Sequence, residues 1–433
     1  MPDKNQEQKL HKNLKKSTNQ IVLFFVLITK NILPNCHVYV TIMYVNSISC
    51  LEVKIKKLKI ALIGAGGIIA ETYKEALLEN SNFELCCICD QDLEKLNKSV
   101  YAGENVAKLT NYQDVSKLDV DCVLIATPPA THYGIAKYFL ENDINVFVEK
   151  PATTNYKDLV DLYKTAEENN AKFSVMLHWQ YGSEIVYLTE TIQEYINKYG
   201  KITKMEALVS DPYCDETKKH IKPEKVALSG TWLDCGINCL SMFENIVAFD
   251  NLEKESIDCK IDAKPGLPYY SDHNFILNDD IKMKIKIDWR EQKNFKRRFI
   301  YFENGAVMFV DNQDQIIYLA NTDKEKEQLR SLVARLEDFH DAAHPNRPDF
   351  LYDYLQPVCD FESVTVCNRL HSHYYNLLTQ RKIAVENGKA VIVPQTEEEI
   401  TARTQELFNK TAKSNKYVYD FDVTIKNQES ILE

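Results

Sequence analysis

The sequence predicts an α/β protein in which a doubly wound parallel sheet is followed by an α+β domain with a large open, mainly antiparallel sheet. Between residues 57 and 178, short runs that are apolar on both faces alternate with amphipathic helical stretches, as in a parallel sheet covered by helices on both sides. From residue 179 onward, apolar and polar residues alternate, which is typical of strands with one face in solvent. The 433 residues are enough for two such domains.

The first domain is expected to span residues 57–178. Its helices show one apolar face; for example, Ile135, Phe139 and Leu140 share a face of one helix. The expected elements are, in chain order, a strand ending in Gly64, a helix over Gly67–Glu79, strands over Phe83–Asp90, Ala107–Leu109 and Asp121–Pro129, a helix over Thr131–Asp143, a strand over Ile144–Lys150, a helix over Asn155–Asn170 and a strand over Ala171–Leu177.

The second domain is expected to span residues 179–395, with one face of its sheet open and the other packed on helices. Strand patterns occur over Lys201–Asp211, Glu255–Lys264, Asp280–Trp289 and Phe295–Asn312, with a hairpin turn at Glu303–Ala306. Helices are predicted over Lys324–Asp341 and Leu351–Leu378. The open face suggests self-association, so we expect a homodimer or a higher homo-oligomer.

Both ends of the chain are expected to lie outside these domains. Residues 1–56 include an apolar run, Ile21–Ile28, which resembles the core of a signal peptide but is shorter than the roughly 20 residues needed to span a bilayer. We therefore expect a poorly ordered extension and no membrane association, with targeting as the alternative. Residues 396–433 form a charged tail of unknown placement.

The net charge and the cysteines indicate which class of molecule the protein binds and in which cellular compartment it works. A net charge of -11 provides no basic patch for a phosphate backbone, so we expect a small-molecule partner and no nucleic acid. Twelve cysteines are scattered without paired spacing, which suits the reducing cytoplasm. Cys86 and Cys89 would point to opposite faces of one strand, and we assign no metal site.

A glycine-rich loop follows the first predicted strand. Gly64, Gly66 and Gly67, with Ile68, stand between that strand and a helix, where glycines allow the backbone to approach a pyrophosphate at the helix N-terminus. This context predicts a Rossmann domain, although Ile69 stands where a third glycine or alanine is usual. Asp90, at the end of the second strand, is placed to bind an adenosine ribose, which favours NAD over NADP. The alternative is that Asp90 only caps the next helix.

Two charged residues stand where the predicted buried strand Ile144–Lys150 ends, namely Glu149 and Lys150, and Pro151 follows them. Burying charge is costly, so their place at the end of a buried strand needs an explanation. The carboxyl edge of an open parallel sheet is where ligands bind, so these charges would face a cofactor cleft. There Lys150 would stabilise an alkoxide in the transition state. Glu149 would position Lys150 or contact the nicotinamide ribose.

These motifs resemble the glucose-fructose oxidoreductase and inositol dehydrogenase family (Gfo/Idh/MocA) from about Lys57 to about Leu370. The resemblance rests on GAGGIIA, on ATPPATH with VFVEKP, and on GTWLDCGINCLSMFENI. It implies that Lys150 contributes to catalysis and that Thr127, Pro128 and His132 contact the cofactor. The alternative for His132 is an ordinary histidine at the start of a helix.

The third motif departs from the family pattern Asp-x-Gly-x-His, because Asn238 stands where the histidine is usual. Asparagine does not titrate in the working range. The motif is similar to that of the aldose 1-dehydrogenases, which oxidise the more acidic anomeric hydroxyl. This resemblance implies that Asp234 takes the proton and that Asn238 hydrogen-bonds the reacting hydroxyl. The alternative is that Asp234 is an N-cap at the head of a solvated polar stripe.

The segment between the two domains carries Trp179, Gln180 and Tyr181, which could bind a sugar or could serve interdomain packing. Taken together, the sequence predicts an NAD-dependent oxidoreductase acting on a sugar or polyol, with hydride leaving C1 of an aldose. The alternatives are an inositol or dihydrodiol type of dehydrogenase and a non-catalytic NAD-binding sensor of the same fold.

Overall fold

The computed structural model describes residues 58–65, 73–78, 83–103, 105–339, 348–360, 381–386 and 389–394. The predicted segments 1–56 and 396–433 lie outside this set, as do three predicted cofactor residues, Gly66, Gly67 and Ile68. All described residues belong to one compact unit that begins at Lys57. No helix among them is long and apolar enough to cross a membrane.

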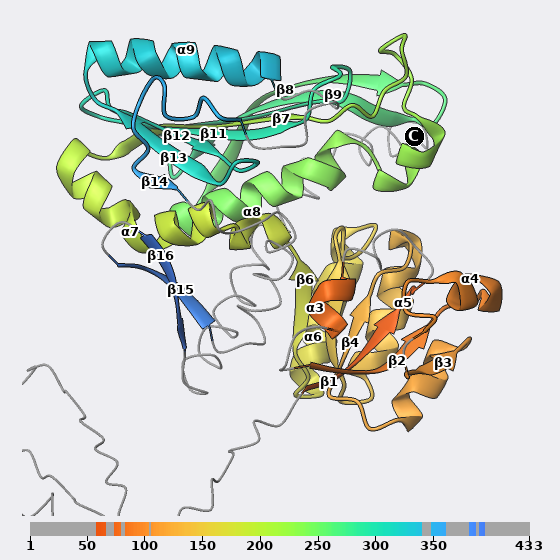
Figure 1. The fold of residues 1–433 in the computed structure, drawn as a ribbon. Helices are drawn as coiled ribbons and strands as arrows, with labels where there is room; N and C mark the ends of the chain where they lie inside the picture. Colours follow the sequence, from red (N-terminus) through yellow and green to blue (C-terminus); the bar gives the residue numbers. More distant parts are fainter. Residues whose placement is uncertain are drawn as a thin grey trace, which may run out of the picture. The chain divides into compact units, whose positions relative to one another are not determined.

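The first half of the described chain forms a six-stranded parallel sheet in the order β3-β2-β1-β4-β5-β6 (Figure 1). This order is that of a doubly wound Rossmann sheet and confirms the predicted fold class. Its strands are β1 Leu58–Ile63, β2 Phe83–Cys89, β3 Ala107–Leu109, β4 Cys122–Ile125, β5 Asn145–Glu149 and β6 Phe173–Met176. The helical connections are α3 Lys74–Leu78, α4 Leu93–Lys98, η1 Tyr112–Lys117, α5 Pro129–Leu140 and α6 Tyr156–Glu168.

Both faces of this sheet are buried, as its uniformly apolar strands require. On β1, Ile60 and Leu62 enter one hydrophobic cluster, whereas Ala61 and Ile63 enter the other. Successive residues of a strand point to opposite faces, so each face has its own core. Because all six strands run parallel, their carboxyl ends lie at the same edge of the sheet, and the two cores hold that edge in place.

The second half forms an eight-stranded sheet in the order β14-β13-β12-β11-β7-β10-β9-β8. Most neighbours are antiparallel, as predicted, but β10 and β7 run parallel, so the sheet is mixed. Its strands are β7 Ile202–Ser210, β8 Leu252–Asp262, β9 Leu267–Leu277, β10 Ile281–Asp288, β11 Phe295–Phe302, β12 Val307–Asp311, β13 Ile316–Ala320 and β14 Cys359–Asp360. A separate hairpin joins β15 Arg381–Glu386 to β16 Lys389–Pro394.

Helices cover parts of both faces of this sheet, so the face that was predicted to be open is open only in part. On one face lie α7 Ser183–Tyr199 and α8 Ile237–Ile246 (Figure 1). On the other face, α9 Asp323–Phe339 buries Leu329, Leu332 and Leu336 against β12 and β13. The face of β7, β10 and β9 away from α8 instead carries ion pairs such as Lys284–Asp272 (2.8 Å). Dimerisation through this face stays a prediction.

Several other elements differ from the sequence prediction; three of them concern the second domain most directly. The helix α7 and the strand β9 were not predicted, because the spacing of their apolar residues was not distinguished from the alternation of apolar and polar residues around them. A helix was predicted over Leu351–Leu378, but residues 351–358 form turns and β14 follows at Cys359–Asp360. The remainder of that range lies outside the described residues.

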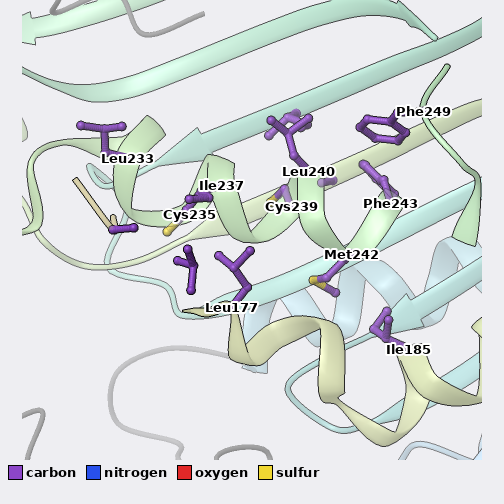
Figure 2. Packing of buried hydrophobic residues seen from close by; sticks show 14 of the residues in the cluster. Leu177, Ile185, Leu233, Cys235, Ile237, Cys239, Leu240, Met242, Phe243 and Phe249 are labelled. Atoms are coloured by element: carbon purple, nitrogen blue, oxygen red, sulfur yellow. The ribbon is translucent and has the colours of Figure 1, made fainter. Parts of the chain in front are cut away.

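The helix α8 is buried nearly all round, which fixes the position of the site. Its apolar residues pack between the sheet and the chain from Leu177 into α7. Figure 2 shows Met242 on the side of α8 that faces Leu177 and Ile185, and Leu240 on the other side. Because both sides are packed, a rotation or a shift of the helix along its axis would disrupt contacts on both sides.

We predict that His273 makes the protein acid-sensitive. This fully buried side chain stacks on Trp232 (3.8 Å between ring centroids), and neither ring nitrogen has a hydrogen-bond partner in the described part of the chain. Burial lowers the pKa of His273 to about 3. The unfolded chain binds the proton near pH 6.5, so stability is lost as pH falls from about 6.5 to about 3, at up to about 1.4 kcal/mol per pH unit.

Denaturant unfolding across this pH range tests the prediction. His273→Phe retains the stacking and should show a shallower acid loss than the wild type. His220→Asn, which changes a histidine with a 60% exposed side chain, is the control and should keep most of the wild-type slope. Identical slopes for the wild type and His273→Phe would contradict the assignment.

Candidate functional site

The carboxyl ends of β1, β2, β4 and β5 meet at one edge of the six-stranded sheet, where the predicted turn begins. Gly64 follows β1 with a φ of +94°, and its N–H donates to the carbonyl of Cys89 (2.7 Å). A Cβ on Gly64 would lie 2.6 Å from the carbonyl oxygen of Ala126. The close approach of two strand ends therefore requires glycine here.

Asp90 lies at the same edge, directly after β2, and is half-buried. Its Oδ1 accepts from the N–H of Asp92 (3.0 Å). The N-cap of α4 is Asp92, whose Oδ1 accepts from two amides in the first turn of that helix. The alternative that Asp90 only caps the helix was therefore wrong, and its contact with a ribose stays a prediction.

The loop between β4 and α5 carries Thr127, Pro128 and His132. His132 is 1% exposed, and its ring nitrogens lie 2.6 Å from the carbonyl oxygen of Thr127 and 2.9 Å from that of Pro151. Burial lowers the pKa of His132, whereas the two carbonyls oppose this. His132 thus joins the loop after β4 to the turn after β5. Cofactor contacts of Thr127, Pro128 and His132 stay predictions.

Glu149 is the last residue of β5 and is 5% exposed. Its carboxylate accepts a hydrogen bond from the hydroxyl of Tyr73 and another from the N–H of Lys150 (3.1 Å). Burial raises the pKa of Glu149, although Tyr73 and Lys150 act in the opposite direction. Glu149 therefore holds the backbone of Lys150, and the peptide bond from Lys150 to Pro151 is cis.

The third motif of the sequence, which contains Asp234 and Asn238, begins on a π-helical turn, η4 Trp232–Gly236. This turn runs directly into α8. The N–H of Ile237 donates to the carbonyl of Trp232, five residues earlier. A Cβ on Gly236 would lie 2.3 Å from the ring of Trp232, so glycine lets the ring pack against the turn. Asp234 lies inside this turn, and the alternative that it is an N-cap was wrong. Such wide turns are frequent at functional sites.

Lys150 and Asp234 form an ion pair, with Nζ of Lys150 donating to Oδ1 of Asp234. Their side chains are 14% and 9% exposed, so both charges are largely removed from water. Burial lowers the pKa of Lys150, but the charge and hydrogen bond of Asp234, with smaller contributions from Cys235 and Glu149, raise it above its ordinary value. Lys150 is therefore held as a cation at neutral pH.

Asn238 follows Asp234 by one turn and is 1% exposed. Its Nδ2 donates to the carbonyl of Asp234 (3.2 Å), while its Oδ1 has no hydrogen-bond partner among the described residues. Ser241, farther along the predicted polar stripe, is 2% exposed, so the alternative of a solvated stripe was wrong. A buried acceptor without a partner favours a bound donor.

The segment η2 His178–Tyr181 carries the predicted substrate residues. Gln180 is 4% exposed, and its Nε2 has no hydrogen-bond partner among the residues with described positions, whereas its backbone carbonyl accepts from Asn245 in α8 (3.4 Å). Trp179 is half-buried, with the guanidinium of Arg298 5.4 Å from its ring. The side chain of Tyr181 lies outside the described residues. Substrate binding by all three stays a prediction.

Sequence reasoning missed three groups of the site, namely Tyr73, Asp211 and Lys296. Lys296 donates to Asp211 (2.6 Å), and Asp211 lies near Asp234. Asp211 follows a strand directly, and this position after β7 is the one signal that could have indicated it. Neither of the other two lies in a motif that the sequence distinguishes.

The residues at the carboxyl edge fit a dinucleotide, because the tight turn at Gly64 directly follows β1 and the carboxylate of Asp90 directly follows β2, the two positions that contact a dinucleotide in a Rossmann sheet. Gly64 and Asp90 would hold the cofactor on the adenosine side, and Lys150 would lie at the reacting end. Among the residues that the structure describes, no group of three His, Cys, Asp or Glu is placed to hold a metal ion.

Residues 58–177 match a family model described as "Oxidoreductase family, NAD-binding Rossmann fold". A protein of Streptococcus pneumoniae named "Uncharacterized oxidoreductase" is 32% identical over 117 residues, which are 27% of this chain and 30% of that protein. Inositol 2-dehydrogenase 1 of Paenarthrobacter aurescens is 31% identical over 99 residues, which are 23% of this chain and 29% of that protein.

The crystal structure of a dehydrogenase from Chromobacterium violaceum is similar with a TM-score of 0.60 and 12% identity, covering 87% of this chain and 98% of that one. This likeness extends the shared fold over both sheets. By sequence, in contrast, the chain spans about a third of the length of the first curated relatives that it matches.

We predict that Asp234→Asn moves the pKa of Lys150 below its ordinary value. The variant removes the group that raises this pKa and leaves the burial that lowers it. The titration of Lys150 can be followed by the NMR signal of its ¹³Cε, assigned by its loss in Lys150→Met. Asp90→Asn removes another carboxylate at the edge and should leave the titration unchanged. An unchanged or raised pKa of Lys150 in Asp234→Asn would contradict the pairing.

Proposed function

We propose that this chain, whose residues 58–177 belong to the Gfo/Idh/MocA oxidoreductase family, is an NAD-dependent dehydrogenase that oxidises a CH–OH group of a sugar or polyol. The observation that carries the proposal is the ion pair between Lys150 and Asp234, because it joins a cation and a carboxylate at the carboxyl edge of the cofactor-binding sheet. Alcohol oxidation needs this combination, since one group stabilises the oxygen and the other removes the proton.

The protonation state of Lys150 determines the roles of Lys150 and Asp234 in the proposed reaction. Because its pKa is raised, Lys150 remains an ammonium and does not serve as the base. Its charge instead stabilises the oxygen of the substrate as negative charge develops there. Asp234 accepts the proton of the hydroxyl. Glu149 fixes the backbone of Lys150, so the ammonium reaches the oxygen from a defined direction.

The finer part of the proposal is an aldose that is oxidised at C1. NAD supplies the acceptor for the hydride that leaves C1, and the sugar becomes a lactone. An anomeric hydroxyl is more acidic than a secondary alcohol, so a carboxylate suffices as acceptor and a histidine at position 238 is not required. The unpartnered Oδ1 of Asn238 would accept a hydrogen bond from a hydroxyl of the sugar.

A second candidate, an inositol type of dehydrogenase, is favoured by the similarity to inositol 2-dehydrogenase 1 of Paenarthrobacter aurescens. In that case the hydroxyl is that of a cyclic polyol, and Asp234 or a water molecule takes the proton. A third candidate, a sensor that binds NAD without turnover, retains the edge around Gly64 but makes no use of the ammonium of Lys150.

The experiment is an absorbance assay for reduced nicotinamide, with NAD or NADP and a panel of aldoses and inositols. We expect turnover with NAD and an aldose. Lys150→Ala should lower kcat at least about 100-fold while NAD still binds, because the group that stabilises the developing charge is lost. Lys157→Ala, an exposed lysine on α6, is the matched control and should retain wild-type turnover.

The other outcomes separate the candidates. Turnover with inositols but with no aldose would reject oxidation at C1 and favour the second candidate. Measurable NAD binding with no turnover of any compound in the panel, in the wild type as in Lys150→Ala, would favour the sensor.

A further inference from the structure

A second buried lysine–aspartate pair lies beside the first. Asp211, directly after β7, is 4% exposed, and its Oδ1 accepts from Lys296 of β11 (2.6 Å). Lys296 also donates to Oδ1 of Asn294 (2.5 Å). The backbone N–H of Asp211 donates to the carbonyl of Asp288 (3.2 Å), which holds the backbone in place where the chain leaves β7. This pair lies outside all three motifs in which the family resemblance was found.

The thiol of Cys235 lies between the two carboxylates. Its Sγ is 3.3 Å from Oδ2 of Asp234 and 3.7 Å from Oδ2 of Asp211. Cys235 is 2% exposed, and burial, together with the charges of Asp234 and Asp211, raises the pKa of this thiol well above its usual value. The thiol therefore keeps its single proton and donates to one carboxylate at a time.

The hydrogen bonds thus form one line from Lys150 through Asp234, Cys235 and Asp211 to Lys296. When the thiol donates to Asp234, both oxygens of that carboxylate are occupied, one by Lys150 and the other by the thiol. When the thiol turns to Asp211, Oδ2 of Asp234 is released and can accept a proton.

We propose that Asp211 and Lys296 are positioning residues that act on Asp234 through the thiol of Cys235. Asp211 provides the alternative acceptor that withdraws the thiol from Asp234, and its negative charge favours protonation of its neighbour. Lys296 offsets that charge and holds Asp211 in place. The inference rests on the proposed function, since it concerns how readily Asp234 takes a proton from the substrate.

The sign of each charge gives opposite expectations for two variants. Removing the cation in Lys296→Met leaves two carboxylates close together without the neighbouring positive charge, so the acid limb of kcat/KM moves to higher pH. Removing the anion in Asp211→Asn leaves an extra cation, so the acid limb moves to lower pH. The other titratable groups that face these carboxylates are Lys150, Glu149, Tyr213 and Cys235.

The experiment compares pH profiles of kcat/KM for the wild type and these variants. We expect shifts of opposite sign in Lys296→Met and Asp211→Asn, with the wild-type profile restored in Lys296→Arg. Cys235→Ser keeps a donor between the two carboxylates and should retain the effect of Asp211→Asn on the acid limb, whereas Cys235→Ala removes the link and should weaken that effect. Cys239→Ala removes the same atoms one turn along α8 and is the control. Activity loss in both charge variants with an unmoved acid limb would overturn the proposal.

A second readout does not depend on turnover. The S–H stretching band of Cys235 can be isolated by subtracting the infrared spectrum of Cys235→Ser from that of the wild type. We expect a band at lower frequency than that of a thiol without a carboxylate acceptor, and a further shift in Asp211→Asn. A band unchanged in Asp211→Asn overturns the proposal even if the protein oxidises sugars. The expected shift in a protein without turnover would instead support the linkage and reject the proposed function.

Discussion

The buried ion pair between Lys150 and Asp234 is the interaction on which the site depends, because it joins the two halves of the described chain. Lys150 follows a strand of the six-stranded sheet, and Asp234 lies on the turn that leads into α8 beneath the eight-stranded sheet. Each charge has lost most of its hydration, so removing one partner leaves the other uncompensated. For a fully buried pair this costs about 3–5 kcal/mol, and the remaining exposure of both side chains makes the cost smaller here.

The geometry around this pair follows from backbone constraints. Gly64 allows two strand ends to approach closely, and Gly236 allows the ring of Trp232 to pack against the π turn. Glu149 holds the amide of Lys150, while His132 joins the loops that follow β4 and β5. The reacting groups are thus fixed by elements that are themselves buried on both sides, which is the condition for stabilising charge without reorganisation.

The sequence predicted the parts of the fold and site that depend on local pattern. Apolar runs alternating with helices identified the parallel sheet. The asparagine at position 238, where the family motif has histidine, was evident from the sequence alone. What depended on tertiary contacts was not predictable: the parallel pairing of β10 with β7, the packing of the predicted helix α9 on β12 and β13, and the lysine–aspartate pair of Asp211 and Lys296. Asp211 and Lys296 are 85 residues apart, and no spacing rule connects them.

In the proposed reaction a hydride leaves C1 of an aldose while Asp234 takes the proton of its hydroxyl. The most direct measurement is the mass of the reduced nicotinamide formed from an aldose that carries deuterium only at C1. If C1 is the carbon that is oxidised, one deuterium appears in the reduced nicotinamide. Reduced nicotinamide without deuterium, formed at the same rate as from the unlabelled sugar, would contradict oxidation at C1.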